Sequence, residues 1–543
     1  MMSKKSRIGI YIALAGACLG VLGDYLIHGV PFGLGTFAWF VLLTFSIVSI
    51  KYRNGLWKDY SNEIALLCAL LFFASTFVWR DAVPLTLLNI FAILVILITI
   101  TIRAFGINPW FAGTIHYIVA AISNAVNFVF APVMLLFMDI DWKGITGKQA
   151  PSQFAAILKG FAVLIPVGFI LAMLLISADS TFAAFVNGIV TVKLSNIIYH
   201  VVTIGFFTWL TTGYLRTVGF GFPWLQPNMK LASATDYNPI FPVEKYDRAH
   251  AGVANISEKT RKSTFTNFDN SILPRSLTLG SVEISIILGG INLLFLTFVI
   301  FQIPYLFGGL ELVQKTPDFK LSEYARHGFG ELILVAAIVL PLLLISEWLL
   351  RKNDKANALV FKILAIVQIA LLGVILVSAA QRLILLSGPL GYGFTSARLY
   401  PLFFILFLGA TFAWFTISVL RNARNQFAWG TLWCGLFVLL LLNTLNPDEF
   451  IAKKNIDLML QGRPFDADLY SGDGGSADSI PVLLEALPKM SPADGERIIS
   501  IFERQKCQIQ RNYGIRQFNF SREKAYKLIK QNIDSNTVCD DSM

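Results

Sequence analysis

Apolar runs of about 20 residues recur along most of this chain, and they constrain its fold more than any other feature. A helix of that length spans the hydrocarbon layer of a membrane, where every backbone polar group must be satisfied internally. Only 14% of the residues are charged and 55% are hydrophobic, whereas soluble domains carry roughly 25% charged residues. The sequence therefore predicts an all-α, polytopic transmembrane bundle of about 11–12 spans with a small, mainly helical C-terminal extramembrane region.

The boundaries of the predicted spans follow directly from the apolar runs. They are 8–26, 34–50, 63–79, 83–102, 155–177, 196–218, 280–303, 328–350, 357–378, 397–420 and 427–445. The first run follows three basic residues, as in a signal peptide, but no small-residue cleavage site comes after it. We expect it to be retained as the first helix.

The basic residues gather in short connectors between the runs, so charge predicts which connectors are cytoplasmic. This rule places the N-terminus inside and the residues after 446 outside, provided that segment 104–138 makes no net crossing. Asn124 and Asn127 lie in the middle of that segment and could turn a re-entrant hairpin. The alternative is one ordinary span there, with a weaker charge bias elsewhere.

The predicted organisation has four parts. These are N-terminal transmembrane helices over 1–220 with the hairpin near 104–138, a basic cytoplasmic loop over 221–279, transmembrane helices over 280–445, and an extracytoplasmic tail domain over 446–543. In the tail, helices are predicted to begin after Ser479 and Ser491. Cys507 and Cys539 in the tail either form a disulfide in an oxidising compartment or stay free thiols.

Polar groups at the predicted outer helix ends are the candidates for a functional site. Ionisable residues at the mouth of a membrane helix are costly unless they are paired, hydrated or functional. If the helices bundle, these side chains converge on one outer-face polar cluster, and four of them belong to the connector before residue 328. The candidates are Asp24, Asp179, Tyr305, Glu323, Arg326, His327, Glu331, Arg398 and Asp448.

Simpler interpretations of these residues remain open. His327 and Glu331 are four residues apart, so they share a helix face and could relay protons, but an interfacial cap explains them more simply. Asp179 also resembles a helix-capping residue. His116 and His200 lie in apolar runs with no carboxylate close in sequence and are interpreted as buried structural histidines.

No cofactor or metal site is predicted from the motifs. The five cysteines are scattered, with no Cys/His grouping of metal-ligand spacing. The chain has no phosphate-binding GxxxxGK[ST] loop, no HExxH, no GxSxG and no dinucleotide fingerprint. The net charge of +10 comes from the short connectors, so nucleic acid is not an expected partner.

Several short motifs resemble an uncharacterised bacterial family of multi-pass membrane proteins, domain of unknown function 4153/4173. The motifs are Gly23-Asp24-Tyr25, Gly29-Val30-Pro31, residues 177–183, residues 305–309, residues 323–329, Asn446-Pro447-Asp448, Phe450-Ile451-Ala452 and residues 518–522. His327 and Ser180 depart from the family's pattern, where a second arginine-type residue and a proline are expected. The resemblance implies an integral protein of the bacterial inner membrane, and it brings no activity, substrate or catalytic residues with it.

Three function classes follow from these features. The first is a transporter-like bundle for a small solute or lipid, consistent with many crossings and polar groups among them. The second is a membrane enzyme that acts on a lipid-linked substrate, with Asp24 in the first outer loop. The third is an envelope scaffold or signalling protein whose tail contacts a protein partner. In each class the lipid bilayer itself is a partner.

Overall fold

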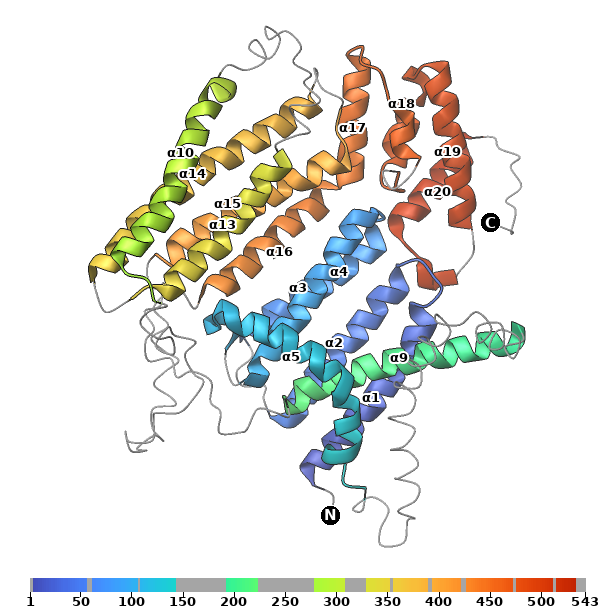
Figure 1. Ribbon diagram of the computed structural model, residues 1–543. Helices are drawn as coiled ribbons and strands as arrows, with labels where there is room; N and C mark the ends of the chain where they lie inside the picture. Colours follow the sequence, from blue (N-terminus) through green and yellow to red (C-terminus); the bar gives the residue numbers. More distant parts are fainter. Residues whose placement is uncertain are drawn as a thin grey trace, which may run out of the picture.

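The computed structural model describes residues 3–55, 61–105, 108–142, 192–222, 278–307, 329–351, 355–388, 393–420, 426–471, 475–510 and 514–533. Within these ranges the chain is helical and contains no β-strand; its one β-type contact is an isolated bridge between Leu279 and Leu350. The predicted all-α polytopic bundle is therefore confirmed. Figure 1 shows long helices packed side by side, with shorter tail helices at one end.

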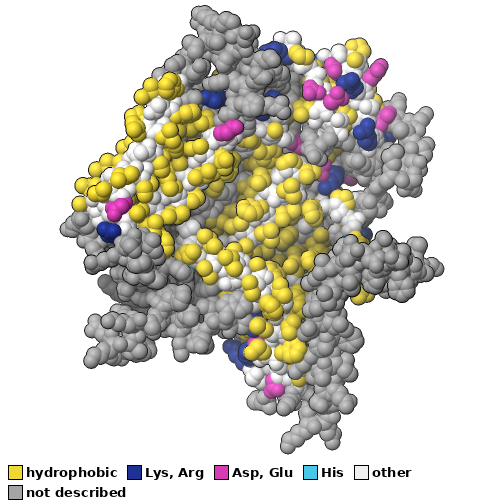
Figure 2. All heavy atoms as spheres, in the orientation of Figure 1, with side chains coloured by type: hydrophobic (Ala, Val, Ile, Leu, Met, Phe, Trp, Pro, Cys, Tyr) yellow, Lys and Arg dark blue, Asp and Glu magenta, His cyan; other side chains and the backbone are white. Residues whose placement is uncertain are grey.

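Nine helices in the described ranges are long and apolar enough to cross a membrane. They are α1 (Lys4–Leu26), α2 (Leu34–Asn54), α4 (Val83–Thr101), α5 (Thr114–Met134), α10 (Ser281–Phe307), α13 (Phe329–Leu349), α14 (Lys355–Ser387), α15 (Ser396–Ser418) and α16 (Phe427–Leu445). Two further apolar helices, α3 (Ser61–Trp79) and α9 (Val192–Phe220), pack among them. Hydrophobic side chains cover the face shown in Figure 2, and the visible charged groups gather toward the ends of the helices. The chain is thus an integral membrane protein.

The membrane helices form two groups, each with its own apolar core. The first core joins α1–α4 and α9, and the second joins α10, α13, α14 and α15. Helix α16 connects them, because Trp429 and Leu436 enter the first core while Phe427 enters the second. We call the contact zone of α16 with α4 and α15 the α16 seam.

The tail is a small helical unit with a separate core. It comprises α17 (Pro447–Leu460), α18 (Ile480–Ala486), α19 (Pro492–Gln510) and α20 (Phe520–Asn532). Tyr470 and Phe502 are fully buried at its centre. Helix α18 begins next to Ser479 with proline in its first turn, and the Ser491 hydroxyl accepts a bond from the Asp494 N–H (3.2 Å) at the start of α19. The predicted starts of these two tail helices are therefore confirmed.

The predicted turn at Asn124 and Asn127 is wrong, because both residues lie inside the continuous helix α5. The amide of Asn124 donates to the Thr101 hydroxyl of α4, and that of Asn127 donates to the Thr217 hydroxyl of α9. Buried amides that find hydroxyl partners on neighbouring helices do not need a turn to be satisfied. The polar pattern that suggested a loop is therefore interhelical hydrogen bonding.

Ion pairs place segments before and after α5 at the same end of the bundle. Arg103, in the 3-10 turn that follows α4, pairs with Glu63 at 2.7 Å, and Lys51 at the end of α2 pairs with the same carboxylate. Asp139, just after α5, pairs with Lys5 of α1 at 2.7 Å. Because α1 and α2 are antiparallel neighbours, the start of α1 and the end of α2 are adjacent. We call this the Lys5 end of the bundle, and the opposite end the tail end (Figure 1).

Helix α14 is longer than the sequence predicts. It runs from Lys355 to Ser387, whereas the expected span was 357–378. Arg382 lies beyond that expected span, yet it is buried within the helix. A polar residue in a helix end can be accommodated by neighbouring helices, which composition alone does not show.

Candidate functional site

The α16 seam ends in a sharp break between α16 and α17. Asn446 adopts a left-handed conformation with φ 57°, and it is the one non-glycine residue with positive φ among those described. Asparagine tolerates this region because its side chain forms local hydrogen bonds, here from Nδ2 to Glu449 Oε2 at 2.7 Å. Pro447 then opens α17 with its fixed φ. The break places Asp448 in the first turn of α17, pointing into the protein.

Asp448 is a buried carboxylate at this break, with only 2% of its surface exposed. Neither of its oxygens accepts a hydrogen bond of normal geometry from the described residues, although the Ser476 hydroxyl is near enough to favour the ionised form. Burial, with added repulsion from Asp478 and Asp81, raises the pKa of Asp448 to about 7. A carboxyl group with that pKa gains and loses its proton near neutral pH.

Charged side chains around Asp448 join the tail to the bundle. The Asp81 N–H donates to Asp478 Oδ2 (2.8 Å), and the Ala477 N–H donates to Asp81 Oδ2 (3.0 Å). Arg522 of α20 pairs with Asp81 Oδ1 at 2.6 Å, and Ser521 donates to Asp478. We call this group the tail junction. Its contacts connect the α3–α4 turn with segments about 400 residues later, so the tail has a defined position on the bundle.

Arg80 extends the tail junction toward α16. Its Nε and Nη2 both donate to the carbonyl of Asn443, at 2.9 and 2.8 Å, and its Nη1 lies 3.9 Å from Asp478. Within α4, the amide of Asn89 exchanges hydrogen bonds with that of Asn443 in α16, at 3.0 and 2.9 Å. Polar groups thus continue from the tail junction into the α16 seam.

An apolar cavity of about 460 Å³ lies along the same seam. It falls within the 300–1,000 Å³ that ligand pockets usually occupy. Side chains of α15, α16 and the 3-10 turn at Pro109–Phe111 form its walls, and the polar side-chain groups among them are those of Gln426 and Cys434 and the indole N–H groups of four tryptophans. The lining residues are Trp110, Leu406, Ala410, Trp414, Gln426, Trp429, Gly430, Trp433, Cys434, Phe437, Val438 and Leu441.

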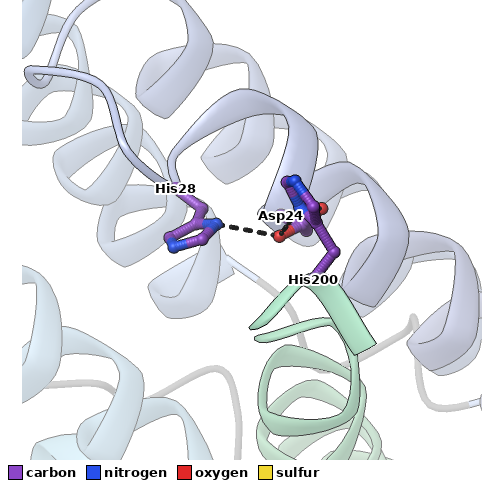
Figure 3. Close-up of side chains that lie close together, drawn as sticks. All are labelled: Asp24, His28 and His200. Carbon is purple, nitrogen blue, oxygen red and sulfur yellow. Dashed lines mark hydrogen bonds and ion pairs between the residues drawn. The ribbon is translucent and has the colours of Figure 1, made fainter. Parts of the chain in front are cut away.

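A second polar group lies between α1 and α9 at the tail end (Figure 3). His28 Nδ1 lies 2.9 Å from Asp24 Oδ1, and His200 Nδ1 lies 2.8 Å from Asp24 Oδ2. The side chain of Asp24 is 11% exposed, whereas that of His200 is 58% exposed. One ligand-type atom from each residue lies within 4.8 Å of the others. Carboxylate and imidazole groups at such distances could hold a metal ion.

Glycines of α1 bring this second group together. A Cβ atom at Gly20 would lie 1.9 Å from the Thr208 hydroxyl, and one at Gly16 would lie 2.0 Å from that of Thr212. At Gly23 a Cβ would lie 2.7 Å from the Phe207 ring. Small residues at this spacing allow close approach of two membrane helices. We call Gly16, Gly20 and Gly23 the glycine stripe, and it sets the distance between Asp24 on α1 and His200 on α9.

The candidates from the sequence occupy different places in the structure. Asp24 contacts His28 and His200, and Asp448 lies at the tail junction. Glu331 is exposed in the first turn of α13, and Arg398 in α15 donates to the Gly393 carbonyl. Tyr305 lies within α10, but its side chain is outside the described residues, as are Asp179, Glu323, Arg326 and His327 entirely.

Sequence reasoning missed several residues of the tail junction and of the polar group around Asp24. The interpretation of His200 as a buried histidine without a carboxylate is wrong, because it is exposed and contacts Asp24 from 176 residues away. His28 lies four residues after Asp24, and this i,i+4 spacing was a usable signal. His116 caps the start of α5 by accepting from the Gly113 N–H (3.0 Å). Asp81 and Asp478 had no local signal, since their partners are distant in sequence.

A family model described as a domain of unknown function, DUF4153, matches residues 67–486. The chain belongs to this family. The DUF4153 match runs from within α3 to the end of α18, so it includes the α16 seam with Asp81, Asp448 and Asp478. Asp24 and His28 precede it, whereas His200 lies inside it. A search of curated proteins and a search of solved structures found no match.

Proposed function

We propose that this chain is a transporter-like protein of the bacterial inner membrane, and that its substrate is a lipid or another amphiphile with an apolar chain. The observation that carries the proposal is the tryptophan-rich cavity on the α16 seam. It lies where the two helical groups meet, and transporter substrates bind between structural halves. A small polar solute would find few hydrogen-bonding partners in it, which favours the lipid over the solute.

The dimensions of the cavity support an acyl chain as its occupant. Its lining extends along α16 from Gln426 to Leu441, which is roughly 22 Å of helix at 1.5 Å per residue. The hydrocarbon core of a bilayer is about 30 Å thick, so one acyl chain occupies about half of it. The polar groups of Asn89, Asn443 and the tail junction continue from its tail-side limit, where a headgroup would need polar partners.

Asp448 supports a link between substrate movement and protonation. It is buried at a helix break, and it faces Asp478 and Asp81 while Arg80 and Arg522 supply positive charge nearby. Buried ionisable groups beside membrane helices mark proton and substrate pathways in transporters. Loss or gain of one proton changes the charge balance of the tail junction.

The charge distribution supports a cytoplasmic N-terminus and an extracytoplasmic tail. The Lys5 end carries Lys4, Lys5 and Arg7 at the start of α1, with Lys51 and Arg53 at the end of α2. Cytoplasmic connectors are enriched in such residues. The tail end faces the opposite side of the bilayer.

Lipid movement in liposomes tests the proposal directly. Purified full-length protein is reconstituted with a trace of phospholipid labelled on its headgroup by nitrobenzoxadiazole, and external dithionite bleaches only outer-leaflet label. We expect bleaching beyond the outer-leaflet fraction at a rate that depends on protein, and loss of most of that rate in Ala410→Trp, which fills the cavity. Ile417→Trp on the exposed side of α15 is the matched control and keeps the wild-type rate. Bleaching equal to that of protein-free liposomes contradicts transport of phospholipid.

The tail junction favours a second candidate, an envelope scaffold or signalling protein whose tail contacts a protein partner. The tail has its own core and a fixed ionic attachment to the bundle, as expected for a unit that transmits a contact. Deletion of the residues after 446 separates the two candidates. Loss of a specific co-purifying protein with lipid movement unchanged supports the scaffold, whereas loss of lipid movement supports the transporter.

An enzyme acting on a lipid-linked substrate would instead alter the labelled lipid chemically, which thin-layer chromatography of the same liposomes detects.

A further inference from the structure

We propose that Asp24, His28 and His200 bind one divalent transition-metal ion between α1 and α9, with Zn²⁺ as the representative ion. The site goes beyond the proposed transport function and does not depend on it. It uses two imidazole nitrogens and one carboxylate, and two of its residues lie next to the α1–α2 turn (Figure 3).

The distances among the ligand atoms are close to those of a metal site. Zinc binds imidazole nitrogen and carboxylate oxygen at about 2.0–2.2 Å, so ligand atoms of a tetrahedral site lie roughly 3.4 Å apart. Here the His28 and His200 Nδ1 atoms lie 2.9 and 2.8 Å from their nearest Asp24 oxygens. Outward shifts of these ligand atoms by a few tenths of an ångström would make room for an ion among them. Shifts of that size are within normal side-chain adjustment.

The scaffold holds these ligands before any ion arrives. Asp24 lies in the last turn of α1 and His28 lies two residues after the helix ends. The His28 ring packs against Tyr199 of α9, with ring centroids 4.4 Å apart. The glycine stripe fixes the spacing of α1 and α9 beneath them. A preorganised site binds more tightly because less side-chain freedom is lost on binding.

The donor set selects a class of ion. Two imidazoles and one carboxylate suit Zn²⁺ and its transition-metal neighbours, whereas Mg²⁺ and Ca²⁺ prefer oxygen ligands alone. Three protein ligands leave a coordination position for water or another ligand, as in zinc sites that do more than stabilise the fold. The exposure of His200 leaves this position accessible.

The same contacts also permit a simpler arrangement, in which both histidines donate hydrogen bonds to the carboxylate. In that arrangement the tautomers place a proton on each Nδ1, and no ion is required. The two arrangements differ in a measurable way, because metal binding displaces those protons and gives a stoichiometric complex.

Metal binding by the full chain tests the proposal. Detergent-purified protein is stripped with a chelator, titrated with Zn²⁺ and analysed for bound metal, and Co²⁺ is used in parallel for its visible d–d absorption. We expect one Zn²⁺ per chain and an absorption band typical of four-coordinate Co²⁺. Asp24→Asn, His28→Gln and His200→Gln should each weaken binding by at least about tenfold, since even second-shell changes cost 10–100-fold.

Two further variants keep the test independent of folding defects. His200→Cys retains a zinc ligand and is expected to keep stoichiometric binding, with an additional sulfur-to-cobalt charge-transfer band in the Co²⁺ spectrum. His116→Gln removes a histidine that caps α5 and is the matched control, with wild-type affinity expected. Zinc bound equally by wild type and by all three ligand variants, or no zinc retained by monodisperse wild type at micromolar free metal, overturns the proposal.

Discussion

At the scale of single residues, Asp448 combines a functional position with an energetic cost. Its carboxylate is buried without a full set of hydrogen bonds, and burial raises its pKa from near 4 to about 7. Between these pH values the folded chain holds the proton while the unfolded chain does not. The contribution of this group to stability is therefore fully present below about pH 4 and is lost as the pH rises through about 7. The difference is on the order of 4 kcal/mol.

Asp448→Asn should remove this pH dependence. The amide cannot ionise, so the variant avoids the cost of a buried negative charge at alkaline pH. We expect its thermal midpoint in detergent to be close to wild type at pH 5 and several degrees higher at pH 8.5. Asp457→Asn on the exposed side of α17 is the control, because the pair of that residue with Lys454 lies at the surface. Parallel pH profiles for wild type and Asp448→Asn would contradict the prediction, because they would show that Asp448 makes no pH-dependent contribution to stability between pH 5 and 8.5.

At the scale of elements, the close packing of α1 against α9 depends on glycine. Gly20→Ala would place its new Cβ 1.9 Å from the Thr208 hydroxyl and 2.9 Å from the Thr208 Cα, so the helices must separate. Overpacking of this kind costs about 1–3 kcal/mol. We therefore expect a lower thermal midpoint for the variant, together with weaker Zn²⁺ binding because Asp24 and His200 move apart.

Gly205→Ala is the matched control for this helix pair. A Cβ at Gly205 meets no atom within 4 Å, so the change should preserve the packing, and alanine raises helix propensity. A wild-type midpoint and zinc affinity for Gly20→Ala would mean that the two helices do not depend on this contact.

The elements also show where sequence reasoning succeeds and where it stops. Span positions such as α2 and α16 were predictable because hydrocarbon thickness sets the length of an apolar run. Interhelical contacts were not predictable. The two asparagines of α5 suggested a turn in the sequence, whereas in the structure their amides donate hydrogen bonds to Thr101 and Thr217 on neighbouring helices. The contact of His200 with Asp24 depends on how α1 and α9 pack, and no local pattern in one sequence records that.

At the scale of the whole molecule, the contacts place the start of α1 and the tail helix α20 at opposite ends of the bundle. The start of α1 pairs with Asp139 at the Lys5 end, whereas Arg522 of the tail pairs with Asp81 at the tail end. The chain must therefore cross the membrane an odd number of times between the start of α1 and the tail. Because Arg103 before α5 and Asp139 after it both pair at the Lys5 end, we expect α5 to add no net crossing to the path.

Cysteine labelling in intact cells tests this path. In a background with all five native cysteines replaced, single cysteines are placed at Lys4, Ile107 and Ser471. Lys4 and Ser471 are exposed at the Lys5 end and in the tail, and Ile107 precedes α5 in the sequence. We expect a membrane-impermeant maleimide to label Ser471→Cys in intact spheroplasts, and Lys4→Cys and Ile107→Cys only after permeabilisation, since basic termini stay in the cytoplasm. Labelling of Ile107→Cys without permeabilisation would show that α5 crosses the membrane, and shared sidedness of Lys4 and Ser471 would contradict the opposite placement of the termini.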